Sequence, residues 1–150
     1  MPAIKYFTQE ELKKFFNTVK KYGSLRDYVL FNVMYYCGLR VSEVGLLKLS
    51  SYNKDNGSIY CQRIKKGISG TVTLDIDRQK ILNKYLKSLN EPIKTDPLFI
   101  SRQNNNLHRN RIWKMVKMYI KKANIEDKGT HAFRHSIAIH LLESEANIYW

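Results

Sequence analysis

Residues 25–37, LRDYVLFNVMYYC, are apolar around nearly the whole circumference of a helix. A helix on the surface of a globular protein keeps one polar face for water, so a helix of this kind must be covered on most sides. Gly38 follows directly and is expected to end it. We therefore predict a central helix with a mainly helical domain packed around it.

Further helices and one hairpin are expected along the chain. Thr8 and Glu11 have the spacing of a capping box, which predicts a helix that ends near Gly23. Apolar residues recur at helical spacing from Ile81 to Leu89. Before them, SIYCQRI and TVTLDI are rich in β-branched and aromatic residues and are separated by KKGISG, which predicts a β-hairpin. The predicted fold class is mainly α with a small antiparallel β-sheet or hairpin.

Two more helices are predicted beside polar residues of interest. Ser42 is expected to cap a short helix that runs through Leu47, which places Arg40 in a tight link between two helices. A last helix is expected from about His131 to Ser144.

Composition indicates one globular domain with a polyanionic partner. The chain has 150 residues, of which 43% are hydrophobic, enough to bury a core. A net charge of +13 favours nucleic acid as the partner. No apolar run approaches the roughly 18 residues of a membrane span, and no signal-peptide core is present, so we expect a cytoplasmic protein without a membrane partner. Cys37 and Cys61 are expected to be buried free thiols.

Residues 109–123, RNRIWKMVKMYIKKA, are predicted to form a helix with two different faces. One face is apolar. The opposite face has four basic residues at helical spacing, namely Arg111, Lys114, Lys117 and Lys121. Such a row is either a solvated face or a surface that binds nucleic-acid phosphates, and the net charge favours the second interpretation.

On the last predicted helix, His131 and Arg134 lie on the same side as apolar residues. A guanidinium on the apolar side of a helix needs an anionic partner, because an unpaired buried charge is very costly. The partner is either Glu43, in an internal ion pair, or a bound phosphate. Arg40 in GLRVSE favours phosphate, because two arginines match the two non-bridging oxygens of a phosphodiester and need no metal.

Four stretches together resemble the tyrosine recombinases, the phage-integrase type of site-specific recombinase known from phages and other mobile elements. They are FTQEEL, MYYCGLRVSEVGLLKLSSYNKDNGSIY, KKGISGTVTL and THAFRHSIAIHLLESEAN, and the resemblance extends over nearly the whole chain. The resemblance implies an integrase that recombines double-stranded DNA through a 3′-phosphotyrosyl intermediate, without a cofactor. It also implies a homo-oligomer on DNA for the full-length protein.

The resemblance implies a role for each matching residue. Arg40 corresponds to the first catalytic arginine, with Glu43 as its acidic support. His131 corresponds to an acid–base group, and Arg134 to the second catalytic arginine.

The hairpin resembles the strands that present the family's catalytic lysine. In that register Lys65 is the general acid for the 5′ hydroxyl, and Lys66 is the alternative, because adjacent strand residues point to opposite faces. The chain departs from the family pattern at Ile68, Gly70 and Thr73, where relatives often have lysine, arginine and proline. These departures are expected to weaken DNA contacts at the hairpin more than the chemistry.

The resemblance begins almost at Met1 and stops before the family's nucleophile. Residues 1–150 are therefore expected to form a single catalytic-type domain without the family's N-terminal core-binding domain and C-terminal nucleophile segment. Tyr149 is too close to Arg134 in the sequence for the family's spacing. We expect no nucleophile in this chain, so that it cannot cleave DNA by itself.

Two other functions fit parts of the sequence. A non-catalytic DNA-binding remnant or regulator with the same fold stays an alternative. A metal-dependent hydrolase using His131, His135 and Cys61 is disfavoured, because a HExxH glutamate is missing and Arg134 would repel a cation. The sequence thus predicts neither a metal nor another cofactor.

Overall fold

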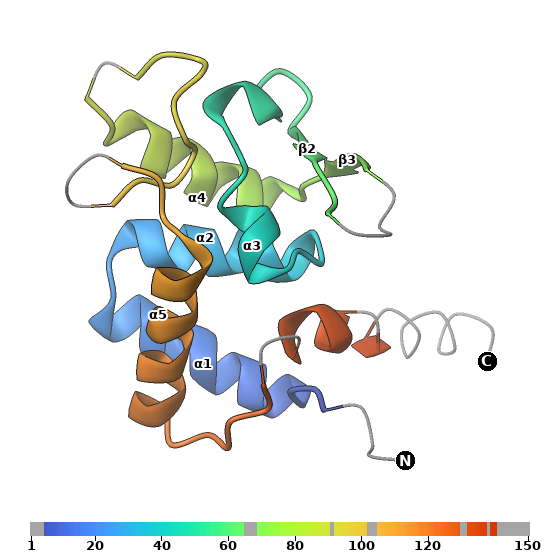
Figure 1. Ribbon diagram of the computed structural model, residues 1–150, viewed down its shortest axis with the longest axis vertical. Helices are drawn as coiled ribbons and strands as arrows, with labels where there is room; N and C mark the ends of the chain where they lie inside the picture. Colours follow the sequence, from blue (N-terminus) through green and yellow to red (C-terminus); the bar gives the residue numbers. More distant parts are fainter. Residues whose placement is uncertain are drawn as a thin grey trace.

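The computed structural model describes residues 5–64, 69–90, 92–101, 105–129, 132–137 and 139–140. Helix α2 (Leu25–Tyr36) lies in the middle, between α4 (Ile76–Lys87) and α1 (Gln9–Tyr22), as Figure 1 shows. Every residue from Val29 to Met34 is buried. The predicted central helix is therefore confirmed. Its one acidic residue, Asp27, is buried and accepts a hydrogen bond from the Tyr119 hydroxyl at 2.6 Å.

The other helices pack as their sequence patterns predict. Thr8 and Glu11 form the predicted capping box of α1, with reciprocal hydrogen bonds of 3.0 and 3.1 Å. Helix α5 (Arg109–Lys122) packs against α1 and against the short helix α3 (Val41–Val44). The predicted helix that contains Arg134 is helical over the described residues 132–137 and 139–140.

A cluster of aromatic rings holds that last helix against the core. The ring of Phe133 lies 5.0 Å from Phe15 of α1, 5.2 Å from Phe7 and 6.1 Å from Phe31 of α2, measured between centroids. Phe133 is 2% exposed, so it is fully anchored. Because Arg134 is the next residue, the aromatic cluster also fixes the backbone from which its side chain extends.

The predicted hairpin is part of a three-stranded antiparallel sheet in the order β1-β2-β3. Strands β2 (Ser58–Cys61) and β3 (Gly70–Thr73) pair with Ile59 opposite Val72. Strand β1 (Tyr52–Asn53) extends the hairpin and was not predicted, because two residues are too few to show an alternating pattern. Figure 1 shows β2 and β3 beside α4 and above α3.

Gly38 ends α2 in the conformation that favours glycine, with φ at +63°. The Leu39 N–H donates to Met34 O at 2.9 Å, and the Gly38 N–H donates to Tyr35 O at 3.1 Å, which is the bonding of a Schellman turn. A Cβ atom at Gly38 would lie 3.2 Å from Cγ2 of Ile137. The turn therefore brings the end of α2 close to the helix that contains Arg134.

The short helix α3 begins two positions earlier than predicted. Arg40, and not Ser42, is its N-cap residue, and the helix ends at Val44 instead of Leu47. The reason is that Glu43, the third residue of the helix, accepts the Arg40 N–H and so defines its start.

Cys37 and Cys61 are buried free thiols, as predicted. The hydrogen bond that the Cys37 thiol donates to Cys61 and burial both raise the pKa of Cys37, so its thiol stays protonated at neutral pH. No helix in the described part of the chain combines the length and the apolar character that crossing a bilayer requires.

We predict that Gly38→Ala lowers the free energy of unfolding by about 1–2 kcal/mol, because a side chain is strained at this positive φ. Urea denaturation followed by circular dichroism measures the change. Gly70→Ala is the matched control, because a Cβ atom there meets nothing within 4 Å. Equal unfolding free energies for the Gly38 variant and the wild type would contradict this account of the turn.

Candidate active site

Glu43 is the buried centre of the candidate site, and its side chain has no exposed surface. Oε1 accepts the Arg40 N–H at 2.9 Å, and Oε2 accepts the Ile64 N–H at 3.1 Å. A buried carboxylate is tolerated only where donors surround it. Glu43 thereby connects the start of α3 to the chain that leaves β2.

Three guanidinium groups surround this single carboxylate. Nη1 of Arg63 lies 3.4 Å from Glu43 Oε1, and Nη1 of Arg134 lies 3.6 Å from the same oxygen. Nη1 of Arg40 lies 3.8 Å from Oε2. Three positive charges thus face one negative charge in a partly desolvated place. This surplus is the electrostatic signature of a site for an anion.

The pKa of Glu43 shows how strongly the site favours its charged form. Burial raises this pKa, but the backbone donors of Arg40 and Ile64 lower it, and the charges of Arg63 and Arg134 add to that effect. The net result is a pKa below the ordinary value of 4.5. Glu43 is therefore ionised at neutral pH.

Arg134 is the least satisfied member of the group. Burial lowers the pKa of its guanidinium, repulsion from Arg40 and Arg63 lowers it further, and Glu43 opposes them. Its Nη1 is buried and has no hydrogen-bond partner among the described residues. A charged donor left without an acceptor is costly, and an oxygen atom of a bound anion would relieve that cost. The side chain as a whole is 34% exposed, so solvent and ligand can reach it.

Of the two interpretations of Arg134 offered by the sequence, the ion pair with Glu43 is observed, and phosphate binding stays a prediction. The Glu43 carboxylate also pairs with two other arginines, so its single negative charge leaves a net positive charge at the site. Arg40, which is 24% exposed, uses Nη1 to donate to Ile64 O at 3.3 Å.

Sequence reasoning missed Arg63. Its Nη1 donates to Gly38 O at 3.0 Å and its Nη2 to Cys37 O at 2.9 Å, which joins the end of β2 to the last turn of α2. Cations favour the carbonyl end of a helix. No local pattern around Arg63 shows which helix end it reaches, because these residues are about 25 positions apart.

A cavity of about 540 Å³ opens beside the arginines. Arg63 and Arg134 contribute its cationic wall, and Tyr36, Val72 and Ile137 contribute an apolar wall. The cavity therefore has the combination of charged and apolar lining that orients an anionic ligand.

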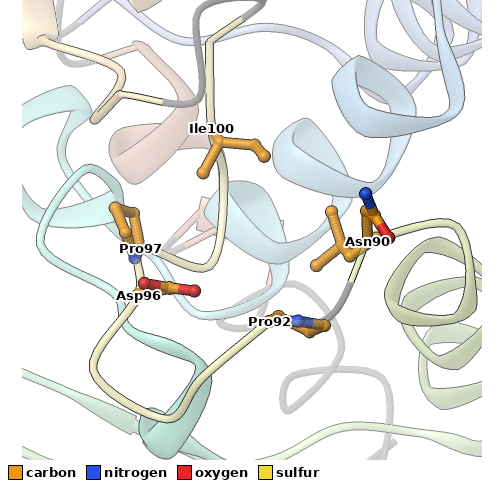
Figure 2. A pocket seen from close by; sticks show the side chains of 6 residues that line it. Asn90, Pro92, Asp96, Pro97 and Ile100 are labelled. Atoms are coloured by element: carbon orange, nitrogen blue, oxygen red, sulfur yellow. The ribbon is translucent and has the colours of Figure 1, made fainter.

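A smaller cavity of about 280 Å³ lies apart from these arginines (Figure 2). It is formed where the segment after α4 folds back, and Asn90, Pro92, Asp96, Pro97 and Ile100 are among its lining residues. Asp96 Oδ2 already accepts the Ile93 N–H at 2.9 Å. No residue of the predicted site lines this cavity.

The basic row on α5 has the predicted arrangement. Arg111, Lys114, Lys117 and Lys121 are all exposed. Ile112, Val116 and Tyr119, on the opposite face, are buried. The two faces of the helix are thus separated as the sequence indicated, and the contact of the basic face with DNA stays a prediction.

Several predicted site residues lie outside the described residues. These are Lys65, Lys66 and His131, together with Ile68 and Tyr149, and the predictions made for them stay predictions.

For the metal-site alternative, the structure describes His135 and Cys61 but not His131. His135 Nδ1 lies 3.2 Å from Lys5 O, and Cys61 is buried beside Cys37. Within the described ranges, no group of three or more His, Cys, Asp or Glu side chains is placed to hold a metal ion.

Comparison with known proteins identifies the family. The model of the phage integrase family matches residues 5–149. The chain therefore belongs to the phage integrase family, the tyrosine recombinases, as its motifs predicted.

The chain is similar to tyrosine recombinase XerA of Pyrococcus furiosus, with 31% identity over 148 residues that cover 96% of this chain and 50% of the relative. The crystal structure of XerA recombinase matches with a TM-score of 0.80 and 27% identity, over 96% of this chain and 51% of that one. XerH site-specific recombinase, bound to palindromic difH substrate in a post-cleavage complex, matches with a TM-score of 0.76 and 26% identity, over 95% and 43%. The chain spans about half the length of the curated relatives it matches.

We predict that the stabilising effect of Glu43 is lost in acid. Because its pKa in the folded protein lies below 4.5, the charged carboxylate stabilises the fold above that pH, and the contribution disappears as the pH falls through the lower folded value. The difference in unfolding free energy between the wild type and Glu43→Gln should shrink from pH 6 to pH 3, as measured by urea denaturation. The control is Glu126→Gln, which removes an exposed carboxylate. A difference that stays constant over this pH range would contradict the prediction.

Proposed function

We propose that this chain is the phosphate-binding catalytic part of a site-specific tyrosine recombinase, which breaks and rejoins double-stranded DNA through a 3′-phosphotyrosyl intermediate. The observation that carries the proposal is the excess of guanidinium charge around Glu43, with Arg134 Nη1 buried and lacking an acceptor. The similarity to XerH, whose structure is described as a post-cleavage complex with its difH substrate, supports it. Since the chain spans about half of its relatives, the complete reaction is assigned to the whole protein.

In the proposed mechanism, Arg40 and Arg134 each donate to a non-bridging oxygen of the scissile phosphate. Their charges stabilise the negative charge that grows as phosphorus becomes pentacoordinate. Glu43 holds the two arginines without neutralising them, because three guanidiniums share its one charge. The tyrosine oxygen displaces the 5′ oxygen, and the 5′ hydroxyl later reverses the step.

Proton transfer in this mechanism is assigned to the two other motif positions. His131 is proposed to accept the proton of the attacking tyrosine and to return it in the reverse step. Lys65, or alternatively Lys66, is proposed to protonate the leaving 5′ oxygen. None of the described residues is proposed to hold a metal or a cofactor, because the arginines supply the positive charge that a cation would otherwise provide.

The DNA surface is proposed to include the basic face of α5. Arg111, Lys114, Lys117 and Lys121 are exposed on one side of a helix of 14 residues, which fits contacts to successive phosphates. We propose that the whole protein acts as a homo-oligomer on its DNA site and that it works in the cytoplasm, where such a site is accessible.

The first test concerns the arginines. Inorganic phosphate, titrated into the chain and followed by ³¹P NMR, should bind the wild type more tightly than Arg40→Ala or Arg134→Ala, by about tenfold or more, since a hydrogen bond to a charged group contributes about 1.5–3 kcal/mol. Arg78→Ala is the matched control, because Arg78, on α4, pairs at 3.1 Å with Asp75, the N-cap residue of that helix. Equal binding by all four proteins would refute the assignment of this site to phosphate.

The second test concerns the basic face of α5. Lys114→Ala combined with Lys117→Ala should weaken binding to duplex DNA and lower the slope of log affinity against log salt by about 0.9 for each phosphate that these lysines neutralise. Fluorescence anisotropy at several salt concentrations measures both effects. The double variant Lys84→Ala and Lys87→Ala removes the same charge from exposed positions on α4. An equal decrease of the slope in both double variants would show that net charge acts without a defined surface.

A further inference from the structure

Arg63 has more defined bonds than either arginine of the proposed phosphate clamp. Its two terminal nitrogens donate to Gly38 O and Cys37 O, and Nη1 also donates to Glu43 Oε1 at 3.4 Å. Its side chain is 15% exposed. A guanidinium whose terminal nitrogens are both occupied, and which is largely buried, is held in one orientation by the protein itself.

The carboxylate of Glu43 has a limited capacity to accept hydrogen bonds. A carboxylate oxygen offers about two lone-pair directions. On Oε1 these are taken by the Arg40 N–H at 2.9 Å and by Arg63 Nη1. Arg134 Nη1 lies 3.6 Å from the same oxygen, close enough for an ion pair but without a hydrogen bond.

We propose that Arg63 is a positioning residue that occupies Glu43 Oε1 and so keeps the Arg134 guanidinium available to a phosphate oxygen. If Arg63 were absent, Oε1 would have a vacant lone pair facing Arg134 Nη1. A movement of a few tenths of an ångström would then convert the ion pair into a charge-assisted hydrogen bond. Arg134 would be held by Glu43, and its affinity for phosphate would fall. This inference rests on the proposed phosphate-binding role of Arg134.

The same contacts explain why Arg63 acts at the site although it comes from a different part of the fold. Gly38 and Cys37 form the turn that ends α2, and Arg40 follows that turn directly. Arg63 therefore fixes the β2 end, the α2 end and Glu43 relative to one another. Its distance to Glu43 is set by these carbonyl bonds and not by the phosphate.

The test is a double-mutant cycle with Arg63→Met and Glu43→Gln, using inorganic phosphate and ³¹P NMR as the probe. In the protein that keeps Glu43, Arg63→Met should weaken phosphate binding at least about threefold, which is the size of coupling expected between neighbouring groups. In the Glu43→Gln background the same substitution should change binding less than about twofold, because the carboxylate that would capture Arg134 is gone. Equal decreases in both backgrounds would show that Arg63 acts only through its charge and would overturn the proposal.

A crystal structure of Arg63→Met gives a readout that does not depend on the stability of the Glu43 variant. The distance from Arg134 Nη1 to Glu43 Oε1 should shorten from 3.6 Å to below about 3.2 Å. A distance that stays at 3.6 Å or lengthens would overturn the proposal.

The failure of the proposed function is recognised separately, because Arg134→Ala would then bind phosphate as well as the wild type. If Arg134→Ala weakens binding and Arg63→Met does not, only the role of Arg63 is refuted.

Discussion

The ionised carboxylate of Glu43, buried among three guanidiniums, is the interaction on which the rest of the site depends. Without that charge, Arg40, Arg63 and Arg134 would repel one another within a partly desolvated space. With it, they are held close together and still leave positive charge in excess. Structural support and the proposed anion binding thus depend on the same charge arrangement, since the carboxylate is too weak a counter-charge to neutralise three arginines.

The fold brings these groups together from three distant parts of the chain. Arg40 follows the turn that ends α2, Arg63 follows β2, and Arg134 lies on the helix anchored by Phe133. Each anchor is rigid for a separate reason: a Schellman turn with a glycine at positive φ, an antiparallel strand pair, and a packed aromatic cluster. Rigid anchors of this kind hold the arginines in place before a ligand arrives, which is what electrostatic stabilisation of a transition state requires.

The apolar wall of the larger cavity has a complementary role. Tyr36, Val72 and Ile137 come from the same three regions as the arginines. They limit access of water to one side of the guanidiniums, and a lower local dielectric strengthens the attraction of those charges for an anion. The same apolar surroundings make an unpaired donor such as Arg134 Nη1 more costly, so the site gains more from binding than an exposed pair of arginines would.

Local sequence patterns were enough for most of the helices and for much of the site. The capping box of Thr8, the apolar run of α2 and the two faces of α5 involve residues within a few turns of one another, so their periodicity is visible in the chain. The motifs around Arg40 and Arg134 likewise indicated a common site. Strand β1 is too short to show an alternating pattern, and the start of α3 at Val41 depends on the hydrogen bond that Glu43 accepts from the Arg40 N–H. Only the tertiary structure decided the contacts of Arg63. Its partners lie at the end of another helix, and no local spacing records a contact between segments that only the folded chain brings together.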